Sequence, residues 1–187
     1  MKIEYITSNR QKFEEAQHIL EDYQLEQISI ELTEIQGDRE TVVIAKAKEA
    51  LKILKRPLIV EDVSFCCKAL NGLPGPYVKE FLIRLKDHGI YELIHKYEDH
   101  SAQAICLAAF IKPGMEPMLF EGAIEGKVVA PRGETKHGTH SWNTIFLPEG
   151  FTKTYGEMSL KEISKISMRR TALIKLREYL ETHEKIN

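Results

Sequence analysis

The sequence lacks the features that mark several classes of protein. Of its 187 residues only three are cysteine, with Cys66 and Cys67 adjacent, and no Cys-x-x-Cys pair is present. The cysteine spacing therefore predicts neither a zinc site nor a dithiol redox pair. Reduced thiols are typical of the cytosol, so we expect a cytoplasmic protein. The longest apolar run, 104–111, is too short to span a bilayer, and no membrane association is expected.

The sequence also lacks a strong charge of either sign. Its formal net charge is −2, so no overall field would attract a nucleic acid polymer or an anionic membrane. The N-terminal stretch Met1–Ile6 leads directly into a strand and is too short and too acidic for a signal peptide. No repeat, low-complexity tract or linker interrupts the chain. We therefore expect one domain over 1–187, large enough for a sizeable core.

Hydrophobic periodicity predicts strands that alternate with helices. The predicted strands, recognised by apolar alternation or a short apolar run, lie at 2–7, 27–35, 58–60, 102–112 and 118–130. The predicted helices, recognised by apolar residues at helical spacing, lie at 12–22, 41–54, 77–85, 89–97 and 159–181. Pro113-Gly114 predicts the turn of a hairpin between the two longest strands. The order indicates a two-lobed α/β fold around a long mixed β-sheet flanked by helices, with a ligand cleft between the lobes.

Glu61 and Asp62 directly follow the apolar run Leu58–Val60, which predicts a buried strand with two carboxylates at its carboxyl end. That edge of a sheet is where open α/β folds bind ligands. Ionised carboxylates in such a place need a partner, and a divalent metal ion is a common one. A Gly/Pro-rich loop follows, with Pro76 expected at the first position of a new helix. An acidic surface turn is the alternative interpretation.

The segment Thr7-Ser8-Asn9-Arg10-Gln11-Lys12 joins the first predicted strand to the first predicted helix. The N–H groups and the positive dipole end of a helix N-terminus bind phosphate, and Lys12 would add a cation. Ser8 or Asn9 could equally be an ordinary N-cap. There is no Gly-rich Walker pattern, so P-loop chemistry is not expected.

Several further motifs occur in a fixed order along the chain. They are Glu34-Ile35-Gln36-Gly37, Leu70–Lys79, Phe120-Glu121-Gly122, Ala130-Pro131-Arg132-Gly133, Phe146-Leu147-Pro148-Glu149-Gly150, Tyr155-Gly156-Glu157-Met158 and Ser167-Met168-Arg169. With Thr-x-Asn-x-x-Lys at 7–12 and Glu61-Asp62, this order resembles the inosine triphosphate pyrophosphatase family over essentially the whole chain. The resemblance implies a homodimer that uses Mg²⁺ to hydrolyse a nucleoside triphosphate to the monophosphate and pyrophosphate. We expect the surface around Leu70–Phe81 to contribute to the dimer.

The resemblance also implies roles for individual residues. Glu34 and Glu61 would be metal-site carboxylates, and Asp62 would activate water, directly or through the metal shell. The phosphate-side residues would be Thr7, Ser8, Asn9, Lys12, Lys46, Lys79 and Arg169, with Lys12 also counted as catalytic. Alternatives remain for three of the cations. The alternative for Lys46 and Lys79 is an ordinary solvated helix residue, and the alternative for one of Arg169 and Arg170 is a solubilising surface residue.

The chain departs from the family pattern where the base should bind. The family reads Phe-Gly-Trp-Asp where this chain has His140-Ser141-Trp142-Asn143, and Ile163 and Met168 replace a lysine and a histidine. Asp only accepts hydrogen bonds, whereas Asn donates and accepts, so base preference should change. His140, Trp142 and Asn143 are the predicted base-binding residues. Alternatives are a broad, weak pyrophosphatase or an inactive nucleotide-binding or regulatory paralogue. The joint presence of the three carboxylates at 34, 61 and 62 favours hydrolysis.

Overall fold

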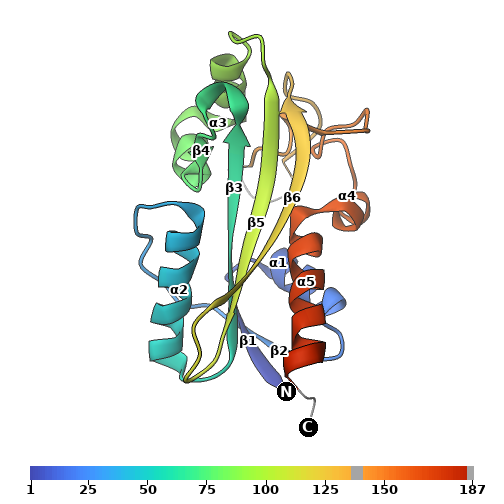
Figure 1. The fold of residues 1–187 in the computed structure, drawn as a ribbon. Helices are drawn as coiled ribbons and strands as arrows, with labels where there is room; N and C mark the ends of the chain where they lie inside the picture. The colour runs from blue at the N-terminus through green and yellow to red at the C-terminus, as the bar shows by residue number, and fades with distance from the viewer. Residues whose placement is uncertain (136–140, 185–187) are drawn as a thin grey trace. The chain divides into compact units, whose positions relative to one another are not determined.

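The computed structural model describes residues 1–135 and 141–184 (Figure 1). The chain forms two compact units. The first unit consists of Met1–Asp62, Cys106–Gly122 and the residues from Met168 onward. The second unit consists of Val63–Ile105 and Ala123–Ser167. Three long strands, β3, β5 and β6, have residues in both units.

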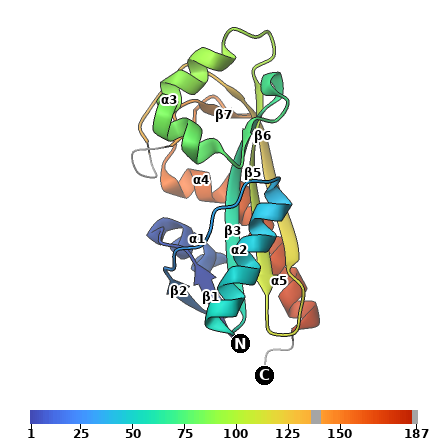
Figure 2. The same ribbon diagram turned by 90° about the vertical axis from the view of Figure 1, so that its left-hand side faces the viewer.

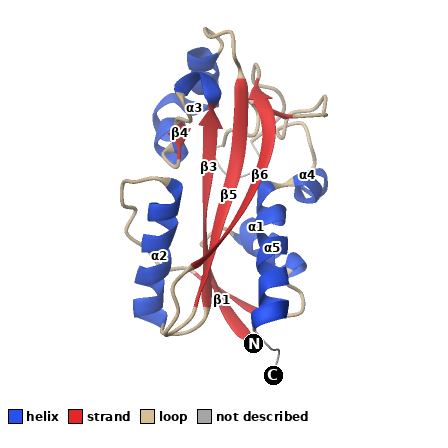
Figure 3. Cartoon of the chain, viewed as in Figure 1, coloured by secondary structure: helices blue, strands red, loops and turns tan. Residues whose placement is uncertain are grey.

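Among the described residues, strands and helices alternate in the N-terminal part of the chain, whereas consecutive strands are followed by two helices in the C-terminal part. In order, the elements are β1 (Lys2–Ile6), α1 (Arg10–Ile19), β2 (Gln24–Ile28), α2 (Arg39–Leu54), β3 (Leu58–Cys67), η1 (Lys68–Leu70), β4 (Pro74–Gly75), α3 (Val78–Ile94), β5 (Ser101–Ile111), β6 (Met118–Val128), β7 (Phe146–Pro148), α4 (Leu160–Ile166) and α5 (Met168–His183). The sheet runs β2-β1-β3-β5-β6-β7, with β4 paired to β3 (Figure 3). Its pairs are parallel at β1–β2 and β1–β3 and antiparallel at β3–β4 and β6–β7. The predicted α/β fold with a mixed sheet is confirmed.

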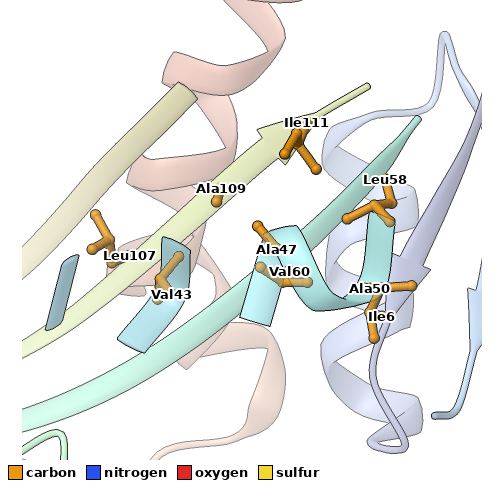
Figure 4. Packing of buried hydrophobic residues seen from close by; sticks show 9 residues of the cluster. All are labelled: Ile6, Val43, Ala47, Ala50, Leu58, Val60, Leu107, Ala109 and Ile111. Atoms are coloured by element: carbon orange, nitrogen blue, oxygen red, sulfur yellow. The ribbon is translucent and has the colours of Figure 1, made fainter. Parts of the chain in front are cut away.

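The core of the first unit lies between α2 and the sheet. Asp38 begins α2 by accepting a hydrogen bond from the Thr41 N–H, and Lys55 ends it in the left-handed conformation. The buried residues of this core are Ile6, Val43, Ala47, Ala50, Leu58, Val60, Leu107, Ala109 and Ile111 (Figure 4). Each large aliphatic side chain buried here contributes roughly 1.5–3 kcal/mol. This packing fixes α2 against β3, which places Lys46 beside the strand.

Helices α1 and α5 cover the other face of the sheet in the first unit, opposite α2 (Figures 1 and 2). Close packing on this face explains the glycine that ends the motif Phe120-Glu121-Gly122. A Cβ on Gly122 of β6 would collide with the backbone oxygen of Met168 and with the backbone of Ala172 in α5. Only glycine therefore lets the first turn of α5, which carries Arg169, lie directly on the strand.

The second unit has an aromatic core. Trp142 stacks on Phe65 with ring centroids 5.0 Å apart, and its edge meets Phe146 at 5.4 Å. Tyr155 packs on the same group, 5.8 Å from Trp142. Helix α3 has a break at Lys86, with φ 58° and ψ −178°, which agrees with the two helices predicted for this region. None of the described helices is long and apolar enough to cross a bilayer.

Two predicted strands have different bounds in the structure. The strand predicted at 27–35 ends at Ile28, because Ile30 and Leu32 pack on the first unit's core without pairing in the sheet. The alternation of apolar and polar residues in this segment therefore results from packing on the core and not from pairing in the sheet. The run at 58–60 continues as a strand to Cys67, because Ser64, Phe65 and Cys67 are also buried. Glu61 and Asp62 consequently lie in the middle of β3, and the prediction that they end a strand is wrong.

Two helix predictions also need correction. The final helix predicted at 159–181 is two helices, because Ser167 has extended backbone (φ −67°, ψ 145°) between α4 and α5. Ser159 begins α4 with a capping box closed by Glu162. Pro76 precedes the N-cap Tyr77, so it lies just outside α3 and does not take the first helical position.

Candidate functional site

Glu61 and Asp62 are consecutive residues of a strand, so their side chains leave β3 on opposite faces of the sheet. Glu61 lies on the face covered by α1 and α5. Asp62 lies on the face covered by α2. The predicted pair of carboxylates is therefore divided between two separate clusters of charge, both within the first unit.

The Glu61 carboxylate is buried and fully hydrogen-bonded. Its Oε2 accepts from the Tyr5 hydroxyl at 2.6 Å and from Arg169 Nε at 2.7 Å. Its Oε1 accepts from Arg169 Nη2 at 2.9 Å and lies 2.9 Å from Lys12 Nζ. Arg169 also donates to Glu15 at 2.7 Å. We call these residues, Tyr5, Lys12, Glu15, Glu61 and Arg169, the buried cluster.

The charges of the buried cluster balance, with two carboxylates and two cations. Burial raises the pKa of Glu61, but Arg169 and Lys12 outweigh it and hold the pKa well below the ordinary glutamate value. Burial followed by Glu61 raises the pKa of Tyr5 well above its usual value, so the phenol is protonated and donates. Burial and Glu61 likewise raise the pKa of Cys106, whose Sγ lies 3.8 Å from Glu61 Oε2. Glu61 is ionised and already bound by two cations.

Asp62 belongs to a smaller and more open group, which we call the open cluster: Glu34, Lys46 and Asp62. Lys46 Nζ donates to Asp62 Oδ1 at 2.8 Å and lies 3.9 Å from Glu34 Oε1. The Glu34 side chain is 58% exposed, whereas that of Asp62 is 16% exposed. Among the described residues Lys46 is the one hydrogen-bond donor to Asp62, so oxygen Oδ2 of this carboxylate can accept from a ligand or water. Sequence reasoning treated Lys46 as a possible solvated surface residue, and the structure places it beside Asp62.

The turn at 7–12 follows β1. Asn9 is the N-cap of α1, with Oδ1 accepting from the N–H groups of Gln11 and Lys12. Thr7 Oγ1 accepts from the Asn9 N–H, and Ser8 is exposed. The plain capping role considered for Asn9 is therefore present. Lys12 points from this first turn to Glu61 and keeps 28% of its side chain exposed.

The other predicted ligand residues belong to the second unit. Lys79 is exposed in the first turn of α3. Trp142 is part of the aromatic core, and the buried Asn143 accepts a hydrogen bond from the Ser141 hydroxyl through Oδ1. His140 lies outside the described residues. Ile163 of the second unit and Met168 of the first are both buried. The predicted cleft between lobes stays a prediction.

Three residues near these clusters were missed by the sequence reasoning. Tyr5 and Glu15 complete the buried cluster, and Glu49 of α2 hydrogen-bonds Thr33 beside Glu34. A signal existed for Glu15, because it lies three residues after Lys12 and so shares a helix face with it. Tyr5 gave no signal beyond its place in an apolar strand.

Magnesium needs oxygen ligands, and the two clusters differ in what they can offer. Glu61 does not fit, because both oxygens are taken by Tyr5, Lys12 and Arg169. Glu34 and Asp62 fit better, because the Glu34 side chain is 58% exposed and Oδ2 of Asp62 accepts no hydrogen bond from the described residues. No cluster of three or more His, Cys, Asp or Glu side chains suited to a metal occurs within 1–135 and 141–184. Any Mg²⁺ held by the open cluster would therefore need phosphate oxygens and water as its remaining ligands.

Comparison with known proteins gives consistent matches over nearly the full length. A model of the Ham1 family matches residues 3–179. The inosine triphosphate pyrophosphatase of Schizosaccharomyces pombe is 41% identical over 182 residues, covering 96% of this chain and 95% of the relative. That of Neurospora crassa is 43% identical over 179 residues, covering 95% and 91%. The solved Ham1 protein of Staphylococcus aureus aligns with a TM-score of 0.83 at 27% identity, covering 98% of this chain and all of that one. The family resemblance found in the motifs is confirmed: the chain belongs to the Ham1 family.

Proposed function

We propose that this chain hydrolyses a purine nucleoside triphosphate to the monophosphate and pyrophosphate in a Mg²⁺-dependent reaction. The similar curated proteins are named inosine triphosphate pyrophosphatases, which supports the reaction class. The observation that carries the proposal is the open cluster, where Lys46 joins the carboxylates of Asp62 and Glu34. Two carboxylates beside one ammonium keep a net negative charge, and Oδ2 of Asp62 accepts no hydrogen bond from the described residues, which suits a magnesium–phosphate site.

In this proposal Asp62 is the general base. The oxygen of Asp62 that is not bonded to Lys46 accepts a proton from a water molecule. The water oxygen then bonds to the α-phosphorus, and the bond from that phosphorus to the bridging oxygen of the β-phosphate breaks. The electron pair leaves with pyrophosphate. Lys46 keeps the Asp62 side chain in one orientation, because the Lys46 side chain is only 13% exposed and its ammonium bonds Oδ1 directly.

Charge on the phosphates must be neutralised during this reaction. Of the cations predicted to bind phosphate, Lys46 and Lys12 belong to the first unit and keep 13% and 28% of their side chains exposed. Arg169 suits it less, because its side chain is 8% exposed and its guanidinium is bound by Glu61 and Glu15. Mg²⁺ held by Glu34 and Asp62 would withdraw electron density from the phosphate oxygens.

We further propose that base preference differs from the family norm. The Asn143 carbonyl oxygen already accepts from Ser141, so the amide offers its NH₂ donor, whereas the family's aspartate offers only acceptors. Ile163 and Met168 add no hydrogen-bonding group to compensate. A 6-oxo purine presents a donor at N1, so it loses a matching acceptor in this chain.

The experiment is a panel of nucleoside triphosphates with pyrophosphate release measured in Mg²⁺. It includes the inosine, xanthosine, adenosine and guanosine forms. At least one should be hydrolysed, and Asp62→Asn should lower kcat by about 10²–10⁴-fold, the usual contribution of a general base. Asp99→Asn is the matched control, because Asp99 also pairs with a lysine, Lys68 at 3.1 Å, and lies on the surface of the second unit. Full activity in Asp62→Asn would refute the assigned base.

Two further properties belong to the same proposal. The three free cysteines fit a reducing compartment, which supports the cytosol as the location. A homodimer is supported by exposed apolar side chains around α3: Leu73 is 50% exposed, Ile83 45% and Leu85 44%. Pro74, expected at this surface, is buried. Light scattering over a range of concentrations tests the dimer, and a monomer mass throughout would contradict it.

A further inference from the structure

The segment between β2 and α2 has no sheet partner along most of its length, yet it carries Glu34. Its first part is held by apolar contacts, because Ile28, Ile30 and Leu32 pack against the first unit's core. Its end is fixed at Asp38, the N-cap of α2. From Thr33 onward the side chains are mostly exposed, so apolar packing does not fix Glu34.

A carboxylate on α2 holds the segment at Thr33. Glu49 Oε2 accepts from the Thr33 N–H at 2.9 Å, and Glu49 Oε1 accepts from the Thr33 hydroxyl at 3.0 Å. The backbone N–H at 33 is outside the sheet, so this carboxylate supplies the partner that a strand would have supplied. Hydrogen bonds to a charged acceptor are stronger than neutral ones.

Glu49 and Lys46 lie three residues apart on α2, so they project from the same side of the helix. Glu49 binds residue 33, and Lys46 Nζ lies 3.9 Å from the carboxylate of residue 34. The same helix therefore fixes both the backbone before Glu34 and the cation beside its side chain. The core of the first unit holds α2 against β3, which carries Asp62.

We propose that Glu49 is a positioning residue for the metal site: by binding Thr33 it holds Glu34 beside Lys46 and Asp62. The inference rests on the proposed function, in which Glu34 and Asp62 hold Mg²⁺. Glu49 itself does not touch the substrate. Without it, Glu34 keeps its charge but must be ordered when the metal binds, and ordering one residue's backbone costs enough to weaken binding about tenfold.

The main variant is Glu49→Ala, which removes both hydrogen bonds and suits a helix interior. Thr33→Val removes only the hydroxyl bond. Glu116→Ala is the matched control, because Glu116 also pairs with α2, through Lys48 at 2.7 Å, and does not bind the segment at 28–38. Pyrophosphate release is measured against Mg²⁺ concentration. Binding of Mn²⁺, a spectroscopic substitute with similar oxygen ligands, is measured by electron paramagnetic resonance without turnover, with a nucleoside monophosphate, the proposed product, present to supply phosphate oxygens.

Glu49→Ala should raise the Mg²⁺ concentration for half-maximal activity about tenfold, with kcat at saturating Mg²⁺ close to the unmodified value. Mn²⁺ affinity should fall by a similar factor. Thr33→Val should show a smaller shift in the same direction, and Glu116→Ala none. In a Glu34→Gln background, Glu49→Ala should have no further effect on metal dependence, because Glu49 acts through Glu34.

An unchanged Mg²⁺ dependence in Glu49→Ala, or an equal effect with and without Glu34, would overturn the positioning role while leaving the proposed reaction intact. A fall in kcat alone would show that Glu49 acts outside metal binding and would also overturn it. If the unmodified protein hydrolyses no nucleotide, the proposed function fails, and the Mn²⁺ titration alone decides the inference. Absence of Mn²⁺ binding in the unmodified protein would overturn the inference as well.

Discussion

The buried cluster and the open cluster begin from adjacent residues of one strand, yet their chemistry differs. Glu61 is 1% exposed, with both oxygens bound by a phenol and two cations. Asp62, on the other face, accepts from one lysine among the described residues, and its Oδ2 has no donor among them. An ionised carboxylate that is fully hydrogen-bonded inside a protein stabilises a particular arrangement of cations, whereas one with a free oxygen and access to water can bind a metal or take a proton. The number of partners separates a structural acid from a reactive one.

The comparison predicts opposite consequences for folding and turnover, and the largest effect belongs to the buried cluster. Glu61→Gln leaves Arg169 as a buried cation with one remaining carboxylate. Breaking a buried ion pair from one side typically costs about 3–5 kcal/mol, so we expect a loss of that order in the free energy of unfolding. Asp62→Asn should cost less, because the side chains of its pair with Lys46 are 13% and 16% exposed, against 8% and 1% for Arg169 and Glu61. Urea denaturation measures both.

Two further variants separate the effect of leaving a buried charge unpaired from the effect of losing a hydrogen bond. Glu4→Gln is the control, because Glu4 is also a buried strand carboxylate, paired with Arg56 at 2.7 Å, and lies outside both clusters. A double variant Glu61→Gln with Arg169→Met should be more stable than Glu61→Gln alone, because no unpaired guanidinium remains. If Glu61→Gln is as stable as the unmodified protein but inactive, the two clusters have been assigned the wrong way round.

The second prediction concerns base specificity, which we expect to depend on residues outside both clusters. Restoring the family residues with His140→Phe, Asn143→Asp, Ile163→Lys and Met168→His should improve kcat/KM for inosine triphosphate relative to adenosine triphosphate by roughly a hundredfold, the value of two charged hydrogen bonds of about 1.4 kcal/mol each. Ile163 is buried, and a lysine there is costly. A variant with only His140→Phe and Asn143→Asp therefore accompanies it and should show about half of that gain in free energy.

Kinetics with both triphosphates measures the ratio, and Mg²⁺ dependence should stay unchanged in both variants because neither cluster is altered. If the unmodified protein already prefers inosine triphosphate a hundredfold or more, these four positions do not read the base.

The smallest predicted effect concerns acid stability. The folded-state pKa of Glu61 lies below its ordinary value of 4.5, with Arg169 and Lys12 outweighing the effect of burial. A lowered pKa contributes stability that is complete above the ordinary value and is lost as pH falls below it toward the folded-state pKa. Below pH 4.5 the free energy of unfolding should therefore fall with a slope of up to about 1.4 kcal/mol per pH unit from this group.

Glu61→Gln should lack that part of the slope, and Glu4→Gln should keep it. Denaturation curves at a series of pH values between the ordinary glutamate value and strong acid measure the difference. Parallel acid limbs in the unmodified protein and Glu61→Gln would show that the pKa of Glu61 is the same in the folded and unfolded states.

The sequence by itself determined the α/β fold class, because strand and helix periods alternate along the chain and local periodicity depends only on near neighbours. It also determined the family, because the motifs of that family occur in the same order along this chain. It did not determine the extent of β3, because Ser64 and Cys67 are buried by contacts that local pattern does not contain. It misjudged 29–35 for the same reason, since packing on a core and pairing in a sheet produce the same alternation.

Only the tertiary structure determined which side chains each of the two carboxylates contacts. Glu61 and Arg169 are 108 positions apart, and Asp62 and Lys46 are 16 apart, so no local pattern links either pair. Neighbouring side chains of a strand point to opposite faces of the sheet. The residues that each side chain meets there depend on how helices distant in the sequence pack on that face. On one face α1 and α5 bring two cations that enclose Glu61. On the other face α2 brings Lys46 to Oδ1 of Asp62, and no second donor to Asp62 occurs in the part of the chain that the structure describes.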